Sequence, residues 1–388
     1  MKEERLMILS MLEEGKITSE EAIKLLEALE ESQVIEEDRD KVVDVEKTKE
    51  KMKEFGNVLK EQGKKVEEFS VDLGGKVSEF FKDMKDIEKP KVFSGGYDVI
   101  ETSLEKNISH IENPVIDLKS VNGNISVNFW EKEHMYIEIN CKYKSGIFHK
   151  ENEFYDFTEK DNRLIFLPKI SSNIDLDLKV YLPDKIYDEI LLNTSNGKIQ
   201  IEGFNTNKLQ CITTNGSIIT KDILSKEILL KTKNGKIHLE NINSKDLVLL
   251  TNNGKITLNH IITEDISATT TNSIINGEDI DGEYIMFTTS NGKIIVKDII
   301  SDRVKSIKLY TSNASIDAEI GSIKKDCCFD LQTSMGNISL GIPNLVYKVN
   351  EQGNSGTGKV IAHSTGFNKN KDHFELIAST SRGSIKLW

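Results

Sequence analysis

The stretch Ile190–Phe204, ILLNTSNGKIQIEGF, contains the unit that decides the fold. Its central Asn-Gly belongs to a series with a period of 19 residues, whose asparagines are Asn196, Asn215, Asn234, Asn253, Asn272 and Asn291. A threonine stands two positions before each asparagine: Thr194, Thr213, Thr232, Thr251, Thr270 and Thr289. An isoleucine stands three positions after each: Ile199, Ile218, Ile237, Ile256, Ile275 and Ile294.

This register favours a solenoid over a row of hairpins. Antiparallel hairpins fix their turns locally and have no reason to repeat one residue type in the same column. In a parallel solenoid with coils about 4.8 Å apart, each residue stacks on its counterpart. We therefore predict a parallel β-solenoid with coils of about 19 residues, in which Ile and Leu fill the interior and Asn forms an amide ladder. The glycine that follows each of these asparagines except Asn272, which precedes Ser273, is expected to supply the positive φ of the corner.

Less regular copies extend the array, beginning near Ile307, Phe329 and Leu376, and one early copy covers Ile116–Val127. Between that copy and Ile190 the sequence alternates like longer antiparallel strands. We interpret residues 98–189 as the first repeat with a β-rich cap over the open edge of the first coil, and residues 190–388 as the solenoid repeats.

The first 31 residues predict a helical hairpin. Apolar residues at helical spacing include Leu9, Leu12, Leu25 and Leu26, and Gly15 and Thr18 provide C-cap and N-cap signals. Thirty residues bury little core, so we expect this hairpin module to self-associate or to bind a partner. Residues 32–45 are acidic and are predicted to form a linker.

Residues 46–89 predict a long amphipathic helix. Its apolar stripe includes Phe55, Leu59, Phe69, Leu73 and Phe80, which we treat with the four leucines above as partner-interface candidates. Self-association, packing along the C-terminal domain and contact with a membrane surface are the alternatives for this face. The predicted fold class is thus mainly β: a C-terminal parallel solenoid preceded by a small helical hairpin and a long amphipathic helix.

Composition restricts the function. The 388 residues carry a net charge of −12, and no segment is basic enough to follow a phosphate backbone, so no nucleic-acid partner is expected. The four cysteines lack zinc-site spacing. Neither a signal peptide nor an apolar span of membrane length is recognisable. We expect a cytoplasmic or membrane-peripheral protein, with the cell surface reached by a non-classical route as the alternative.

Few residues suggest chemistry. Asp222, Asp279 and Asp298 share one column with Asn241 and His260, where a cation could bind, but Asp and Asn are ordinary turn residues there. A second column suits either anionic ligands or protection of the sheet, and it consists of Lys198, Lys236, Lys255 and Lys293. No catalytic, cofactor-binding or metal-binding residue is predicted, and no cofactor is expected.

Three C-terminal segments, VNGNISV, DLKVYLPDKIYDEI and TSNGKIQIEG, resemble a bacterial family of putative-adhesin β-repeat domains. The N-terminal ILSMLEEGKITSEEAIKLLEALE is similar to the short helical module that opens many of these proteins in Gram-positive bacteria. The pairing resembles LiaX-like and YvlB-like envelope-stress proteins. The resemblance implies a solenoid and a non-enzymatic role in sensing or regulating cell-envelope stress, and it carries over no ligand residues.

The leading hypothesis is a non-catalytic scaffold, sensor or regulator of the bacterial envelope-stress response. It would act through protein contacts of the helical part and through contacts with the cell envelope. A surface adhesin or glycan-binding solenoid is the alternative. A β-helix enzyme that acts on polysaccharides comes third, because it needs carboxylates clustered in one groove.

Overall fold

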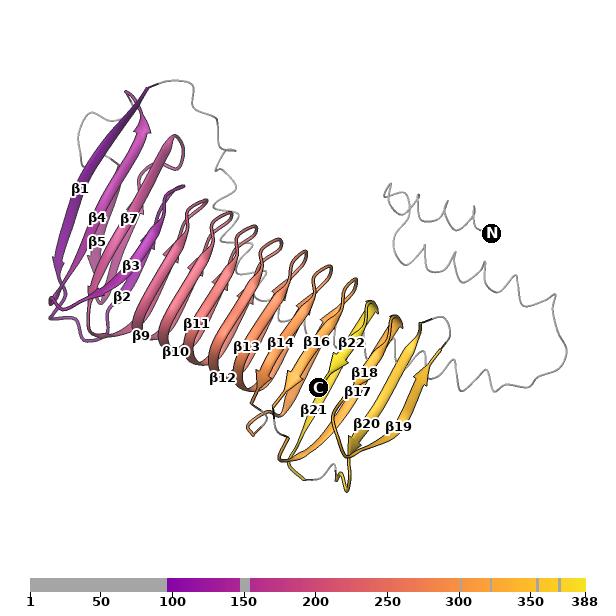
Figure 1. The fold of residues 1–388 in the computed structure, drawn as a ribbon. Helices are drawn as coiled ribbons and strands as arrows, with labels where there is room; N and C mark the ends of the chain where they lie inside the picture. Colours follow the sequence, from indigo (N-terminus) through magenta and orange to yellow (C-terminus); the bar gives the residue numbers. More distant parts are fainter. Residues whose placement is uncertain (1–95, 147–153, 301, 322, 354–355, 369–370) are drawn as a thin grey trace, which may run out of the picture. The chain divides into compact units, whose positions relative to one another are not determined.

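The computed structural model describes residues 96–146, 154–300, 302–321, 323–353, 356–368 and 371–388. These residues form 22 strands of one sheet, wound into stacked coils (Figure 1). β-branched residues and two-residue alternation run through this part of the chain and favour strands throughout.

The predicted mixture of helices and solenoid is wrong for the described residues, which contain strands and no helix. The predicted hairpin (1–31), linker (32–45) and amphipathic helix (46–89) lie outside the described residues. So do all nine interface candidates, Leu9, Leu12, Leu25, Leu26, Phe55, Leu59, Phe69, Leu73 and Phe80. Within the described ranges, no helix is long and apolar enough to cross a membrane.

The middle of the solenoid stacks its coils in chain order. Its strands are β8 (Ile186–Asn193), β9 (Ile199–Ile212), β10 (Ile218–Lys231), β11 (Ile237–Leu250), β12 (Ile256–Thr270), β13 (Ile275–Thr289) and β14 (Ile294–Ile299). All neighbours pair in parallel, and Ile218 of β10 lies beside Ile237 of β11, so the predicted 19-residue register is present. The interior contains the predicted apolar columns, among them the six isoleucines that follow the corners.

The glycines of the Asn-Gly corner are needed for a different reason than predicted. Among the glycines of the described residues, positive φ occurs at Gly146, Gly203, Gly356 and Gly366, none of which belongs to that corner. A Cβ on Gly235 would instead lie 1.7 Å from the carbonyl oxygen of Gly216 in the preceding coil. Successive coils approach too closely at this corner for a side chain, so the requirement is for space.

The threonine column explains this close approach. The Thr232 hydroxyl accepts a hydrogen bond from the Gly235 N–H (3.0 Å) and donates one to the Gly216 carbonyl of the preceding coil (3.0 Å). The same pair of bonds recurs at Thr251, with Gly254 and Gly235. A buried threonine therefore satisfies two backbone groups that the tight corner would leave unpaired.

The predicted amide ladder is confirmed. The Nδ2 atom of each asparagine donates to the Oδ1 atom of its counterpart in the preceding coil, at 2.6 Å between Asn234 and Asn215 and 2.8 Å between Asn291 and Asn272. The ladder contains Asn122, Asn196, Asn215, Asn234, Asn253, Asn272, Asn291 and Asn313.

A second corner has left-handed backbone. Its non-glycine residues have φ between 52° and 54°: Asp222, Asn241, His260, Asp279 and Asp298. Asn, Asp and His tolerate this conformation better than other side chains. The parallel register of β10 with its neighbours omits Asp222 and Lys226, so the coil turns at these two columns. The segment from the first turn to the second, residues 204–207 in β9, is called the short side.

At the N-terminal end, the stack order differs from the chain order. The strands are β1 (Tyr97–Asn107), β2 (Val115–Lys119), β3 (Ile125–Trp130), β4 (His134–Lys144), β5 (Tyr155–Lys160), β6 (Arg163–Pro168) and β7 (Ile174–Pro183). β2 pairs in parallel with both β6 and β8, and β3 with both β7 and β9. The first coil is therefore enclosed by later parts of the chain, and the antiparallel pairs β1–β4, β4–β7 and β5–β6 lie beyond it.

The C-terminal end repeats this arrangement. Its strands are β15 (Ser306–Thr311), β16 (Ile316–Ile320), β17 (Asp326–Met335), β18 (Ile338–Leu340), β19 (Leu345–Gln352), β20 (Gly358–Ser364), β21 (His373–Arg382) and β22 (Ile385–Leu387). β21 lies between β15 and β17, and β22 between β16 and β18, all in parallel. The last coil thus occupies the slot before β17–β18, while β19 and β20 add an antiparallel end.

Candidate functional site

The acidic column at the second corner forms turns and does not assemble a site. The Asp222 carboxylate accepts a hydrogen bond from the Asn241 amide (2.8 Å), and the Asp279 carboxylate lies 2.6 Å from Nδ1 of His260. Each aspartate is thus engaged by the neighbouring coil, on a backbone with positive φ. Among the described residues, no group of three or more His, Cys, Asp or Glu could hold a metal ion.

Two side chains of the lysine column interact with neighbouring residues. The Lys198 ammonium group donates to Gln200 (2.8 Å), and Lys293 forms an ion pair with Asp317. These contacts fit a solvated column that protects the sheet face, because the charges are shared with residues of the same surface.

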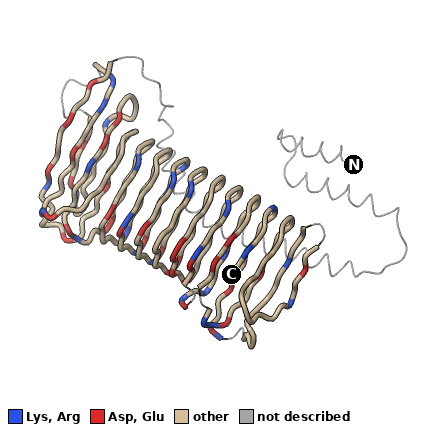
Figure 2. Tube along the Cα trace, in the orientation of Figure 1, with Lys and Arg blue, Asp and Glu red and all other residues tan. Residues whose placement is uncertain are grey.

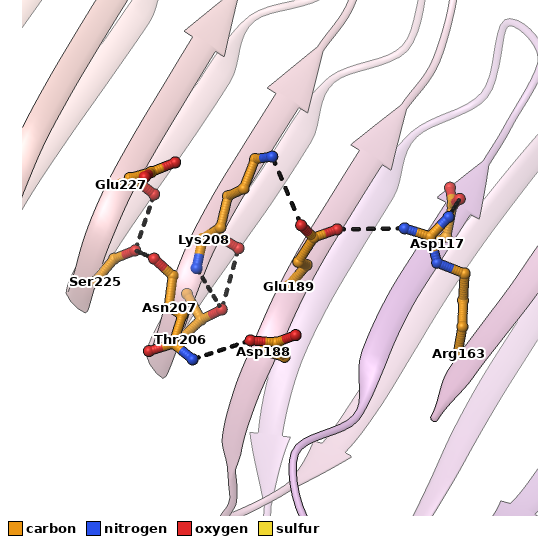
Figure 3. A network of polar contacts seen from close by, with 9 residues as sticks. All are labelled: Asp117, Arg163, Asp188, Glu189, Thr206, Asn207, Lys208, Ser225 and Glu227. Carbon is orange, nitrogen blue, oxygen red and sulfur yellow. Dashed lines mark hydrogen bonds and ion pairs between the residues drawn. The ribbon is translucent and has the colours of Figure 1, made fainter. Parts of the chain in front are cut away.

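A denser polar network crosses the sheet near the first coil (Figure 3). Arg163 of β6 lies 3.5 Å from the Asp117 carboxylate of β2 and 3.2 Å from the Glu189 carboxylate of β8. Lys208 of β9 approaches Glu189 from the other side, at 3.6 Å. The residues come from strands that pair side by side, so the network crosses the slot in which the first coil is enclosed.

Asp117 is the most unusual group in this network. Its Oδ1 atom is buried and has no hydrogen-bond partner among the described residues. Burial raises the pKa of the Asp117 carboxyl, while Lys119 and Arg163 act in the opposite direction. A raised carboxyl pKa suits a general acid, but the Arg163 guanidinium is paired with both the Asp117 and the Glu189 carboxylates. The network is better suited to holding three strands together.

An aromatic cluster lies on the outer face of β3, β4 and β7. The Trp130 ring stacks on Tyr136 and Tyr181, with centroid distances of 5.6 and 5.2 Å. The Lys132 ammonium group lies 4.7 Å from the Trp130 ring centroid, and the indole N–H donates to the His134 carbonyl (2.8 Å). The indole is thus in contact with two rings and an ammonium group, and these contacts hold it beside the β3–β4 turn.

The cysteines are not placed for nucleophilic chemistry. Cys141, Cys211 and Cys327 are buried, and Cys328 is half-buried. Burial raises the pKa of the Cys141 thiol to about 12, which keeps it protonated at neutral pH. The difference in burial between Cys327 and Cys328 reflects the strand geometry, in which neighbouring side chains point to opposite faces.

The residues that the sequence did not single out are Asp117, Arg163 and Glu189. They are far apart in the chain and meet because β2 lies between β6 and β8. A single acidic or basic residue on an alternating strand is ordinary, so no local signal could have identified them.

Comparison with known proteins finds a family match for the β-solenoid. Residues 148–387 match the Toastrack DUF4097 family, and residues 3–33 match the SHOCT-like domain. No curated protein is significantly similar to the chain.

Three solved structures are similar to the chain at low identity. A putative cell adhesion protein from Clostridium sporogenes ATCC 15579 is 11% identical, with a TM-score of 0.21 over 75% of this chain and 99% of that one. A putative adhesin from Bacteroides fragilis NCTC 9343 is 12% identical, with a TM-score of 0.32 over 75% and 97%. A putative adhesin from Parabacteroides distasonis ATCC 8503 is 10% identical, with a TM-score of 0.30 over 76% and 98%.

The family match spans more than half of the chain and covers most of the strands described above, including every coil of the middle region. The chain belongs to the Toastrack DUF4097 family.

Proposed function

We propose that this protein is a non-catalytic scaffold of the bacterial cell envelope, and that it serves the response to envelope stress. The observation that carries the proposal is how the recurring polar residues are used. Thr232 and Asn234, like their counterparts, are occupied in bonds between coils. Such a solenoid presents an extended surface of stacked coils, with its recurring polar residues committed to structure.

Two further arguments support this role. The resemblance of VNGNISV and TSNGKIQIEG to β-repeat domains of envelope-stress proteins supports the cellular setting. The pairing of Arg163 with both Asp117 and Glu189 argues against an acid–base pair, as does the engagement of Asp222 and Asp279 by neighbouring side chains.

We further propose a cytoplasmic protein with a membrane-peripheral pool, which self-associates or binds a protein partner through residues 1–89. Sedimentation tests the second part. Removal of residues 1–89 is expected to abolish self-association. The same number of protomers per particle in the truncated and full-length proteins would contradict it.

The envelope role is tested by deleting the gene in its host and measuring growth under a cell-wall-active antibiotic. We expect altered susceptibility, together with a membrane-associated pool on fractionation. Equal susceptibility of the deletion and parent strains, with the protein confined to the soluble cytosol, would overturn the proposal.

Complementation separates a scaffold from an enzyme. The double variant Asp222→Asn, Asp279→Asn removes the most suggestive carboxylates, and its fold should tolerate the change because Asn241 already occupies that column with a φ of 54°. A scaffold predicts full rescue by this variant at equal protein level. Rescue by the natural chain alone would favour a catalytic role for the column.

A further inference from the structure

The short side of the solenoid presents an exposed apolar residue in every second coil. Ile186, Leu224, Ile262 and Ile300 stand 38 positions apart and are 52%, 49%, 46% and 42% exposed. The strand register places three polar residues between them in the same column: Asn205, Asn243 and Asp281. Ile299 pairs with Ile280, which puts Ile300 beside Asp281. We call these seven residues the short-side ladder.

The spacing of the ladder is set by the coils. Neighbouring coils lie about 4.8 Å apart, so the apolar side chains recur about every 9.6 Å and span about 29 Å in three intervals. Exposed apolar residues scattered singly need no explanation, but a regular row does.

A partner cannot bind to the ladder by pairing with its backbone. Each middle coil is hydrogen-bonded to a coil on both sides, as β10 is to β9 and β11. A partner strand therefore finds no unpaired edge along the ladder. The ladder offers side chains only.

The flanks of the ladder are acidic. The columns two positions before and after it contain the ammonium groups of Lys226 and Lys245, the imidazole of His260, and a larger set of carboxylates: Asp188, Asp222, Glu264, Asp279, Glu283 and Asp298. Three of these carboxylates form ion pairs, Glu264 with Lys245, Asp279 with His260 and Glu283 with Lys305, and the carboxylates remain in excess. Figure 2 shows Asp and Glu recurring along the coils, interspersed with Lys and Arg. Arg303 partly compensates at one end, where it lies 3.4 Å from Asp281. This charge repels a second copy of the ladder and an anionic membrane, and it attracts a basic partner.

The polar residues between the apolar ones are suited to an exposed backbone. The Asn205 and Asn243 side chains are exposed and make no hydrogen bond among the described residues. An amide can donate to a backbone carbonyl and accept from a backbone N–H. An α-helix has satisfied its own backbone groups and gives these amides nothing to bind, whereas an extended peptide does.

We propose that the short-side ladder binds a basic peptide segment in the polyproline II conformation, with an apolar residue at every third position. Three residues of polyproline II rise about 9.3 Å, against about 9.6 Å for two coils. Three turns of such a peptide cover about 28 Å of the 29 Å ladder. Three heptads of an α-helix cover about 31.5 Å and lose register. The apolar side chains pack against Leu224 and its counterparts, and lysines of the peptide face the flanking carboxylates.

This inference names the partner class of the proposed scaffold, and it rests on that function for its cellular setting alone. Binding in vitro tests the ladder by itself, so a negative result would leave the envelope role standing.

The probe is a fluorescent peptide of five Leu-Lys-Pro repeats, titrated with the full chain and followed by anisotropy. The test variant is Leu224→Asn with Ile262→Asn, which repeats the asparagines already present at 205 and 243 and should preserve the fold. The matched control is Ile274→Asn, which is 38% exposed and lies at the Asn-Gly corner. The double variant should weaken binding at least about tenfold, because two half-exposed side chains no longer pack. The control should change it less than twofold.

Four outcomes would overturn the proposal. They are no binding at millimolar peptide, equal loss in the Ile274→Asn control, equal binding of a peptide of the same composition with leucine at every fourth position, and tighter binding of a helical Leu/Lys heptad peptide. Weakening of the interaction between 0.05 and 0.5 M salt is expected from the acidic flanks. Salt-insensitive binding would contradict the charge argument.

Discussion

The middle of the solenoid and its two ends use the same coil in different ways. From β9 to β14 each coil rests on the one before it in the chain. At the ends, the first coil (β2–β3) and the last coil (β21–β22) are each enclosed between strands from elsewhere in the chain. The residues of the columns are alike in both regions, as Thr232 and Thr380 illustrate, since each donates to a carbonyl of the neighbouring coil.

This difference shows that the residues repeated in each column determine how two coils stack on each other. They do not determine which coil of the chain becomes the neighbour. An apolar interior, a threonine and a small residue at the corner fit any neighbouring slot. Which slot a coil takes must depend on its links and on residues outside the columns. The Asp117–Arg163–Glu189 network joins β2 of the first coil to β6 and β8, the two strands between which it lies, and is a specific device of this kind.

The largest expected effect tests the enclosure of the last coil. Ala378→Pro removes a backbone N–H from β21, which is paired on both sides, and should cost more than about 3 kcal/mol locally. Residues 326–364 should lose hydrogen-exchange protection, although they are not mutated, because among the described strands they join the stack through β21 and β22. β9–β14 should keep theirs.

Ala378→Ser is the control and should leave all protection unchanged. Continued protection of residues 326–340 in the proline variant, with residues 371–388 exchanging freely, would mean that β17–β18 had moved into the vacated slot. That result would contradict the predicted loss and would show directly that coils are interchangeable.

A smaller effect is expected where coils approach most closely in the middle. Gly235→Ala places a Cβ against the Gly216 carbonyl and should lower the free energy of unfolding by about 2–4 kcal/mol in urea denaturation. Ser273 occupies the same column, so a side chain can be accommodated there, which limits the loss. Gly282→Ser is the control, because Ser225 and Ser244 already occupy its column. An equal loss in both variants would refute the corner-specific explanation.

The threonine column permits a finer test within one coil. Thr232→Val leaves the Gly235 N–H and the Gly216 carbonyl without their hydroxyl partner and should cost about 1–3 kcal/mol. Thr220 lies in β10, the strand that ends directly before Thr232. Thr220→Val should be neutral or stabilising, because the Thr220 hydroxyl is buried without a partner among the described residues. Thermal unfolding of the two variants gives the comparison, and similar losses would show that the hydroxyl bonds are unimportant.

The smallest effect concerns the enclosed first coil. Arg163→Met leaves Asp117 and Glu189 without the guanidinium between them and should cost about 1–2 kcal/mol at pH 7, since Arg163 is partly exposed. The pKa of Asp117 is already raised above its ordinary value of 3.8, so folding favours the protonated form. The share of the cost that comes from Asp117 is therefore full above its folded pKa and declines as pH falls through it.

Urea denaturation between pH 3.5 and 7.5 measures this dependence. Arg303→Met, which removes an outer ion pair with Asp281, is the control and should cost less than about 1 kcal/mol. A cost in the Arg163 variant that grows as the solution is acidified would have the wrong sign for this explanation.

The sequence predicted the repeating middle well, because the period constrains every residue in it. The 19-residue register, the apolar columns and the asparagine ladder all follow from stacking like on like. The same argument could not predict the enclosed coils, since a coil such as 376–387 fits several slots equally. Asn-Gly is typical both of a left-handed turn and of a close backbone approach. The sequence alone therefore could not show whether Gly235 is needed for a positive φ or for space. The short-side ladder is visible in the sequence as apolar and polar residues that alternate between successive coils, with a period of 38 residues. A search for one residue type repeated every 19 positions does not detect it.

The enclosed ends also have a consequence for the order in which the chain can assemble. During synthesis β2 and β3 leave the ribosome before any of the strands that flank them, so their parallel partners arrive only after residues 163–201 have emerged. The apolar faces of Ile116 and Ile125 are exposed until then. At the other end, β17–β20 are made before the coil that connects them to the stack. Early exposure of unpaired strands invites pairing with other chains, so newly made protein is expected to be most sensitive to aggregation, or most dependent on chaperones, before its final coil is in place.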